Sequence, residues 1–367
     1  MHILADQFLY KVHELLPEEV ECTFYNPAEG LPKNAPLYDA LLIRTVTKID
    51  AETVPKAGNL KFIGTATAGF DHIDLHHLNR LGITFAKSEG CNANAVGEYV
   101  ITALYWWAQS RNTEVKNLKI GIIGLGNTGS AVHGYLEKLG IRPVCYDPPK
   151  AIREPAFNSA SLNELLDCDV LTFHTPLTAT EHHPTFHMCG ERWLKNKFRL
   201  ILNSARGGVV DENALLKAKL RGNVDDYILD VWENEPSFSD AIAENAFIAT
   251  PHIAGYSREA KFRASSMVIA QFCTQFNLEL PAVSMNEQAP KPAAGMNQSF
   301  ADFLWKNNQM DLYHRELRLL IGLEGTEKSR EFANLRSQTK TRFEYGSLLK
   351  QAIDRENLPE KSAIFLD

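Results

Sequence analysis

The segment Lys119–Leu139 constrains the fold of this chain more than any other stretch of its sequence. An apolar run, Lys119–Ile123, leads directly into the pattern Gly124-Leu-Gly126-Asn-Thr-Gly129, and apolar residues then recur at helical spacing. Glycine suits the tight turn, the backbone that approaches a pyrophosphate, and the place where the helix packs against the strand. The pattern therefore predicts a dinucleotide-binding strand–turn–helix unit. A tight turn without a ligand is the alternative.

The next predicted strand is followed by an acid, Asp147, which lies 18 residues after Gly129. A carboxylate there can accept hydrogen bonds from the ribose hydroxyls of adenosine, and it repels a 2′-phosphate. The helix N-terminus supplies positive potential for the pyrophosphate. The predicted cofactor is therefore NAD. Lys150 and Arg153, just beyond the acid, keep NADP as the alternative.

The composition and charge of the 367-residue chain limit the class of protein. Hydrophobic residues make up 44% and charged residues 23%, as in globular proteins with buried cores. The net charge of −7 argues against a nucleic-acid partner, because phosphate binding needs a basic face. No apolar run is long enough to cross a bilayer, and the N-terminus, with its acid at Asp6, does not resemble a signal peptide. We expect a cytoplasmic protein with reduced cysteines and no membrane partner.

Short apolar runs alternate with helical patterns along most of the chain, which predicts an α/β fold with a doubly wound parallel sheet. Ser161–Glu164 and Asp211 are expected to cap two helices. The stretch Glu287–Gly295, rich in Pro and Ala, predicts a linker. The predicted strands are His2–Leu4, Ala40–Ile43, Lys61–Gly64, Lys119–Gly124, Arg142–Tyr146, Val170–His174, Leu200–Asn203, Tyr227–Val231 and Phe247–Ala249, and the predicted long helices are 92–109 and 257–276.

Three polar residues, Arg206, Glu235 and His252, each follow a predicted strand. In an open parallel sheet the active crevice lies beyond the carboxyl ends of the strands. Oxidation of an alcohol by hydride transfer needs a base for the hydroxyl proton, and histidine titrates nearest neutral pH. A carboxylate fixes the histidine tautomer, and a guanidinium can bind a substrate carboxylate through two hydrogen bonds. We therefore predict these three as the catalytic residues. Taken singly, Arg206 could be a surface residue and His252 an ordinary loop histidine.

The motifs around these residues resemble the D-isomer-specific 2-hydroxyacid dehydrogenase family. They are GLGNTG, HTPL, NSARGGVVDENAL, LDVWENEP and TPHIAG. The resemblance implies that Arg206 binds the substrate carboxylate, that Glu235 orients His252, and that His252 acts as acid and base. The carboxylate at Glu235 separates the chain from the formate dehydrogenases. The cofactor-binding residues that it implies are Gly124, Gly126, Asn127, Thr128, Gly129, Asp147, Thr175, Ser204, Ala205, Arg206, Asp230 and Gly255.

The family also implies a domain organisation. A Rossmann NAD-binding domain, residues 93–256, is expected to be inserted in a flavodoxin-like substrate-binding domain formed by residues 1–92 and 257–285. A small α+β domain, residues 286–367, is expected to follow and to make the protein a homodimer.

Further segments are most similar to the family members that oxidise a small phosphorylated hydroxy acid, 4-phospho-D-erythronate, on the route to pyridoxal phosphate. They are IRTVTKI, GTATAGFDHID, EGCNANAVGEYV, YDPPK, HIAGYSREAK and, in the tail, FANLRSQTKTRFEYGSLL. Phe70, Ser204-Ala205 and a short, divergent tail depart from the pattern. The alternatives are a dehydrogenase for 3-phosphoglycerate or another D-2-hydroxy acid, and a non-catalytic NAD-sensing scaffold.

The resemblance implies that Thr45, Thr67 and Tyr256 contact the substrate. Basic residues that could hold its phosphate are Arg44 and Lys48, together with Arg342 if the tail reaches across a dimer; solvated surface charge is the alternative. Two histidine groups mimic metal-ligand spacing, but no matching cysteine or carboxylate set accompanies them, and hydride transfer to NAD needs no metal. We predict no metal site. These histidines are His72, His76, His77, His182, His183 and His187.

Overall fold

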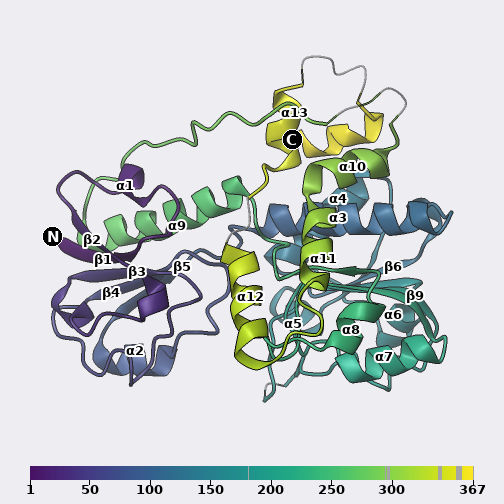
Figure 1. The fold of residues 1–367 in the computed structure, drawn as a ribbon, viewed down its shortest axis with the longest axis horizontal. Coiled ribbons are helices and arrows are strands. Elements are labelled where there is room, and N and C mark those ends of the chain that lie inside the picture. The colour runs from purple at the N-terminus through teal and green to yellow at the C-terminus, as the bar shows by residue number, and fades with distance from the viewer. Residues whose placement is uncertain (181, 294, 296–297, 338–340, 353–357, 367) are drawn as a thin grey trace. The chain divides into compact units, whose positions relative to one another are not determined.

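Two parallel β-sheets form the framework of the computed structural model, which describes residues 1–180, 182–293, 295, 298–337, 341–352 and 358–366 (Figure 1). The chain divides into two units. Unit 1 comprises Met1–Asn92 and Ser257–Gln288, and unit 2 comprises Ala93–Tyr256 and Ala289–Asp367. None of the helices formed by the described residues is both long and apolar enough to span a membrane.

Unit 1 contains a five-stranded sheet with the order β2-β1-β3-β4-β5. The long helix α9 packs on this sheet, and its apolar residues share a core with Phe62 of β4. A Cβ added at Gly64 would lie 2.3 Å from Val268 of α9, so glycine is required for this close approach. The elements are β1 (His2–Asp6), α1 (Val12–Leu15), β2 (Glu21–Tyr25), η1 (Pro27–Glu29), η2 (Ala35–Leu37), β3 (Ala40–Ile43), β4 (Phe62–Thr65), α2 (Leu75–Leu81), β5 (Thr84–Lys87) and α9 (Arg258–Phe276).

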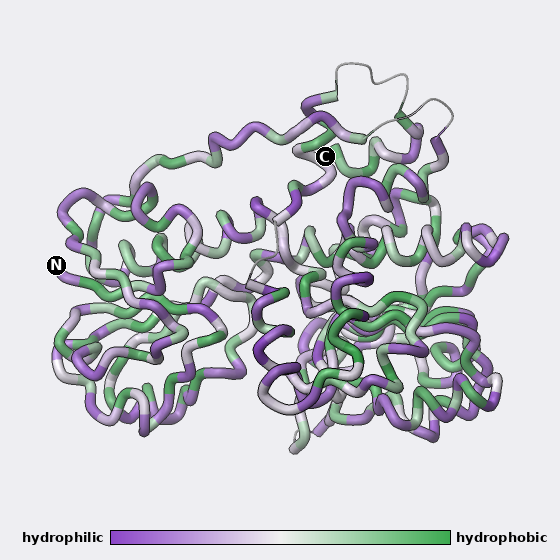
Figure 2. Tube along the Cα trace, in the orientation of Figure 1, coloured by the Kyte–Doolittle hydropathy of each residue, from purple (hydrophilic) through white to green (hydrophobic). Residues whose placement is uncertain are grey.

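The larger sheet, in unit 2, has the order β11-β10-β9-β8-β6-β7, and all its pairs are parallel. Its central strands β6 and β8 are buried along their whole length, and they are mostly apolar because parallel strands of this kind are covered on both faces (Figure 2). The elements are α3 (Ala93–Ser110), η3 (Val115–Asn117), β6 (Ile120–Ile123), α4 (Asn127–Lys138), β7 (Val144–Tyr146), α5 (Pro148–Arg153), α6 (Leu162–Leu166), β8 (Val170–Phe173), β9 (Phe198–Asn203), α7 (Glu212–Leu220), β10 (Val224–Leu229), α8 (Asp240–Asn245) and β11 (Ile248–Ala249).

The strand order of this sheet reverses between β6 and β8, which is where such sheets bind ligands. The loops that follow all six strands lie at one edge because the strands are parallel. Both predicted caps are confirmed: Ser161 and Glu164 form a capping box on α6, and the Asp211 side chain accepts a hydrogen bond from Ala214 N of α7.

The C-terminal segment packs against α3 and α4 of unit 2 and belongs to the same unit. Trp305 stacks on Trp106 of α3 with ring centroids 4.4 Å apart, and Figure 1 shows α10 beside α3. The elements formed by the described residues of this segment are helices, without the strands of the expected α+β domain. Its role in dimerisation stays a prediction. Its elements are α10 (Phe300–Asn308), α11 (Met310–Arg318), α12 (Gly325–Ser337), α13 (Tyr345–Lys350) and η5 (Glu360–Phe365).

A buried carboxylate in β10 fastens α3 to the larger sheet. Asp226 Oδ2 accepts hydrogen bonds from Trp107 Nε1 at 2.9 Å and from Arg111 Nε at 2.7 Å. Lys219 Nζ lies 3.2 Å from Oδ1. Burial raises the pKa of Asp226, but the hydrogen bonds from Arg111 and Trp107 and the charges of Lys219 and Arg111 outweigh it, so the pKa lies below its usual value.

The substitution Asp226→Asn should lower the free energy of unfolding at pH 7 by about 2 kcal/mol, because it removes charge-assisted hydrogen bonds. A depressed folded-state pKa stabilises the protein above the unfolded-state pKa, and this contribution is lost as the pH falls through the folded-state value. Urea unfolding at pH 7 and pH 3 should therefore show a smaller difference from wild type at pH 3. The matched control is Asp225→Asn, an exposed neighbour. A pH-independent difference would contradict this assignment.

Candidate active site

Glycine is needed for different structural reasons at the three glycine positions after β6. Gly124 has a φ of 88°, and a Cβ there would lie 2.8 Å from the His174 carbonyl oxygen. A Cβ on Gly129 would lie 1.8 Å from the Gly124 carbonyl oxygen. A Cβ on Gly126 would meet no heavy atom within 4 Å. The packing of the chain itself thus requires Gly124 and Gly129, whereas the space over Gly126 is open to a ligand.

The residues around this turn fit NAD. Gly126 caps α4 without a side-chain hydrogen bond, so the amides of the helix N-terminus are available to a pyrophosphate. Asp147 Oδ2 accepts a hydrogen bond from Leu125 N at 2.8 Å, which fixes the acid beside the turn. Lys150 Nζ donates to the Leu125 carbonyl oxygen at 2.9 Å. Asn127 is exposed and Thr128 half-buried at the start of α4.

Buried polar atoms also gather after β8 and β9. Thr175 Oγ1, Ser204 Oγ and His174 Nδ1 are buried and have no hydrogen-bond partner within the described part of the chain. Burial lowers the pKa of His174 to about 3, so its ring is neutral. Buried polar groups normally have hydrogen-bond partners, and such groups without a partner at the ends of strands indicate a polar ligand. This observation supports Thr175 and Ser204 as cofactor contacts.

Glu235 and His252 are joined by a hydrogen bond. His252 Nδ1 lies 2.8 Å from Glu235 Oε2, and Trp232 N donates to Glu235 Oε1 at 2.9 Å. Burial raises the pKa of Glu235, but the charges of His252 and Arg336 and these hydrogen bonds outweigh it, so the pKa lies below its usual value. With Nδ1 donating to an ionised carboxylate, Nε2 is the ring atom that can accept a proton.

Asp230 holds the loop that carries His252. Its buried carboxylate accepts hydrogen bonds from Thr250 Oγ1 at 2.6 Å, Ile253 N at 2.8 Å and Ala254 N at 2.9 Å. His252 N donates to the Asp230 carbonyl oxygen at 2.7 Å, and His252 has a φ of 58°, which is uncommon for a residue with a side chain. Burial raises the pKa of Asp230. The sequence suggested Asp230 only as a cofactor contact; the structure adds that it positions His252.

The loop of Arg206 packs directly on the loop that leads to Glu235. The Asn203 side chain accepts a hydrogen bond from Ala205 N at 3.0 Å and donates to the Arg206 carbonyl oxygen at 2.9 Å. A Cβ on Gly207 would lie 1.8 Å from the Trp232 carbonyl oxygen. Sequence reasoning missed Asn203 and Gly207, although an asparagine at the end of a strand, with two glycines four and five residues later, indicates a turn.

The other expected substrate residues are divided between the units. Tyr256, next to Gly255, belongs to unit 2, and its hydroxyl accepts a hydrogen bond from Arg336 Nη2 at 3.2 Å. The candidates in unit 1 follow β3 and β4. Thr45 and Lys48 are exposed, and Thr67 Oγ1 donates to a carbonyl oxygen in its own loop.

Both arginines that the sequence suggested for the substrate phosphate already have carboxylate partners. Arg44 Nε donates to Asp6 Oδ2 at 2.9 Å, and its Nη2 donates to Asp6 Oδ1 at 3.2 Å. Arg342 forms a buried ion pair with Glu98 of α3, so the expectation that it is surface charge or reaches across a dimer does not match the structure. Spacing in the sequence carried no information about this partner.

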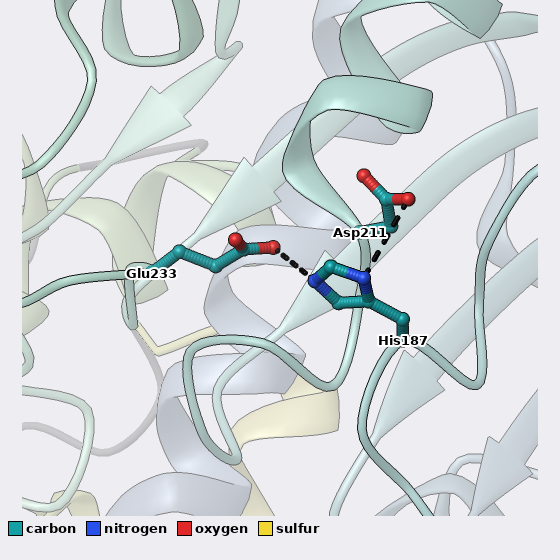
Figure 3. A group of neighbouring side chains, drawn as sticks. All are labelled: His187, Asp211 and Glu233. Carbon is teal, nitrogen blue, oxygen red and sulfur yellow. Dashed lines mark hydrogen bonds and ion pairs between the residues drawn. The ribbon is translucent and has the colours of Figure 1, made fainter.

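His187 lies in a cluster with Asp211 and Glu233 (Figure 3). Its Nε2 is 2.9 Å from Glu233 Oε1, and its Nδ1 is 3.7 Å from Asp211 Oδ2. The expectation that no carboxylates accompany this histidine is wrong. Asp211 and Glu233 lie far from His187 in the sequence, so the spacing of the histidines did not reveal them. The two carboxylates face opposite nitrogens of the ring. The absence of a metal site stays a prediction.

Comparison with known proteins identifies the family. The family model "D-isomer specific 2-hydroxyacid dehydrogenase, NAD binding domain" matches residues 97–254. An erythronate-4-phosphate dehydrogenase of Yersinia pestis (strain Pestoides F) is 35% identical over 368 residues, which cover 96% of each chain. The chain belongs to the erythronate-4-phosphate dehydrogenase family. This membership confirms the predicted α/β fold class, NAD as the cofactor and the class of oxidoreductase.

Other members of the erythronate-4-phosphate dehydrogenase family match in part. The one from Tolumonas auensis is 41% identical over 240 residues, 65% of this chain and 64% of that protein. The one from Bacteroides fragilis (strain ATCC 25285) is 36% identical over 76% of this chain and 81% of that protein. Among solved structures, a D-lactate dehydrogenase from Treponema pallidum has a TM-score of 0.61 at 22% identity, covering 78% of this chain and 100% of that one, and supports the fold alone.

Gly126 and Gly129 should respond differently to alanine. Gly126→Ala should leave the unfolding temperature of the cofactor-free protein unchanged but weaken NADH binding at least about tenfold, because its Cβ occupies the space open to the pyrophosphate. Gly129→Ala should lower the unfolding temperature, because the new Cβ collides with backbone. Differential scanning fluorimetry and NADH fluorescence titration measure the two effects. Equal NADH affinity in Gly126→Ala and wild type would contradict the assignment.

Proposed function

We propose that this chain catalyses the NAD-dependent oxidation of 4-phospho-D-erythronate to 2-oxo-3-hydroxy-4-phosphobutanoate, a step towards pyridoxal phosphate. The reaction is the one that the names of its relatives describe. The observation that carries the proposal is the hydrogen bond between Glu235 and His252, which lies at the carboxyl end of the strands of the NAD-binding sheet.

His252 serves as the base. Its Nε2 accepts the proton of the C2 hydroxyl while the hydride leaves C2, so the alcohol becomes a ketone. Glu235 stabilises the imidazolium that forms, and Asp230 keeps the histidine loop in its uncommon conformation. NAD, when bound, accepts the hydride.

The substrate has two anionic ends, and Arg206 is proposed for the carboxylate. Thr45, Thr67, Tyr256 and Arg44 are proposed to contact the remainder. A homodimer formed through residues 286–367 and a cytoplasmic location complete the proposal, and both rest on the sequence resemblance.

The reaction is tested by initial rates of NADH formation with 4-phospho-D-erythronate, 3-phosphoglycerate and D-lactate. The first substrate should give the highest kcat/KM, and His252→Ala should reduce kcat/KM about a thousandfold because it removes the base. Binding of NADH should be unchanged in His252→Ala. Preference for 3-phosphoglycerate would assign another substrate. No turnover of any substrate, with NADH still bound, would favour the scaffold.

The choice of NAD over NADP is tested at Asp147. Asp147→Ser should raise the ratio of kcat/KM for NADP to that for NAD about tenfold or more, because a neutral residue no longer repels the 2′-phosphate. Serine is chosen since its hydroxyl can still cap α5, as the Asp147 carboxylate does through Lys150 N. The unfolding temperature checks that the cap survives. An unchanged cofactor ratio would remove Asp147 from the selectivity site.

A further inference from the structure

Helix α12 is a polar helix of the C-terminal segment that is anchored on the loop after Glu235 (Figure 2). Its most deeply buried side chain is Phe332, which is only 1% exposed and packs against Phe238 with ring centroids 5.8 Å apart. Lys328 of α12 forms an ion pair with Asp240 at the start of α8. These contacts fix both the position and the rotation of the helix.

Arg336 follows Phe332 by four residues, so both side chains lie on the same face of α12. Arg336 Nη2 donates a hydrogen bond to the Tyr256 hydroxyl at 3.2 Å. Its charge interacts favourably with Glu235 and Asp230. The hydrogen bond to Tyr256 therefore holds the guanidinium within the electrostatic reach of Glu235, although 84 residues separate Arg336 from His252 in the sequence.

The guanidinium also keeps an unused donor. Arg336 Nε is buried and has no hydrogen-bond partner among the described residues. Burial lowers the pKa of Arg336, but Tyr256 and Glu235 outweigh it, so the group stays a cation. The Arg336 side chain as a whole is half-buried, and a cation whose buried N–H lacks a partner is costly unless an anion completes its hydrogen bonds.

We propose that Arg336 is a second arginine of the active site and binds the phosphate group of the substrate. This inference rests on the proposed function. A phosphate carries a charge of about −1.5 to −2 at neutral pH, and it approaches a site that already contains the Glu235 and Asp230 carboxylates. A cation is needed to offset that repulsion, and the planar guanidinium fork matches phosphate oxygens.

The other basic candidates are less suited to this task. Arg342 is buried with Glu98, and Arg44 is bound by two hydrogen bonds to Asp6. Arg336 lies outside residues 97–254, which match the NAD-binding domain shared by the wider family. A residue in a family-specific tail is a reasonable source of specificity for a phosphorylated substrate.

The test compares Arg336→Gln and Arg336→Lys with Arg330→Gln. Arg330 lies on the same helix, but its side chain is 65% exposed and pairs with Glu331, so it is the matched control. Arg336→Gln should raise KM for 4-phospho-D-erythronate about a hundredfold. KM for unphosphorylated D-erythronate should change less than about threefold, and Arg336→Lys should restore part of the loss by retaining the charge. Arg330→Gln should behave as wild type.

NADH affinity and unfolding temperature show whether each variant is folded. An equal rise of KM for both substrates, or no rise for either, would overturn the role in phosphate binding. Calorimetric binding of 4-phospho-D-erythronate to the NADH complex provides a readout independent of turnover. Wild-type binding without turnover, lost in Arg336→Gln, would overturn the proposed reaction and support the phosphate contact. Equal binding by wild type and Arg336→Gln would overturn the phosphate contact alone, and no binding by wild type would overturn both.

Discussion

The buried carboxylate of Asp230 is the constraint on which the reactive part of this molecule depends. It lies just after β10 and accepts three hydrogen bonds from the loop that follows β11. Thr250 continues the network to α3, because its Oγ1 lies 2.7 Å from the Tyr99 hydroxyl. A carboxylate with so many donors can remain buried at tolerable cost. The sheet, the helix and the histidine loop thus share one hydrogen-bond network, and this network positions His252 for its hydrogen bond with Glu235.

The glycine turn shows how a local pattern can combine two kinds of information. Gly124 and Gly129 are required by contacts within the chain, so they indicate only a sharp connection between strand and helix. Gly126 meets nothing within 4 Å, so it is the glycine whose presence the protein's own packing does not explain. The unpaired hydroxyls of Thr175 and Ser204 agree with this distinction, since they too lack a partner within the described part of the chain. Together these features distinguish the residues that the fold requires from those that we assign to the cofactor.

An element can be predicted from the sequence when the residues that form it are close together along the chain. The strand before Gly124, the helix after it and the caps at Ser161 and Asp211 depend on neighbouring residues, and the sequence predicted them. Strands β2 and β5 were missed because they lie at the edges of their sheet and each buries only one residue. An edge strand with so little buried surface leaves a weak hydrophobic pattern.

Side-chain partners that come from distant segments could not be predicted. Nothing near Arg342 indicates that it pairs with Glu98, and nothing near Arg336 indicates that it approaches Glu235. The same holds for His187, whose carboxylate neighbours follow it by 24 and 46 residues. The periodic pattern of the sequence does not show which charged residues are partners, because partners from distant segments meet only in the packed structure.

The split of unit 1 has a consequence for the newly made chain. Helix α9 covers the first sheet and supplies Val268, Ile269 and Phe272 to the core around Phe62. That helix ends at Phe276, whereas the last strand of the larger sheet ends at Ala249. The first unit to leave the ribosome therefore cannot complete its core until α9 is made, and its apolar strands stay uncovered while the second sheet is synthesised. Unit 2 in turn completes its core only when the C-terminal segment supplies Phe303 and Phe365, so each unit depends on residues made after the sheet of the other.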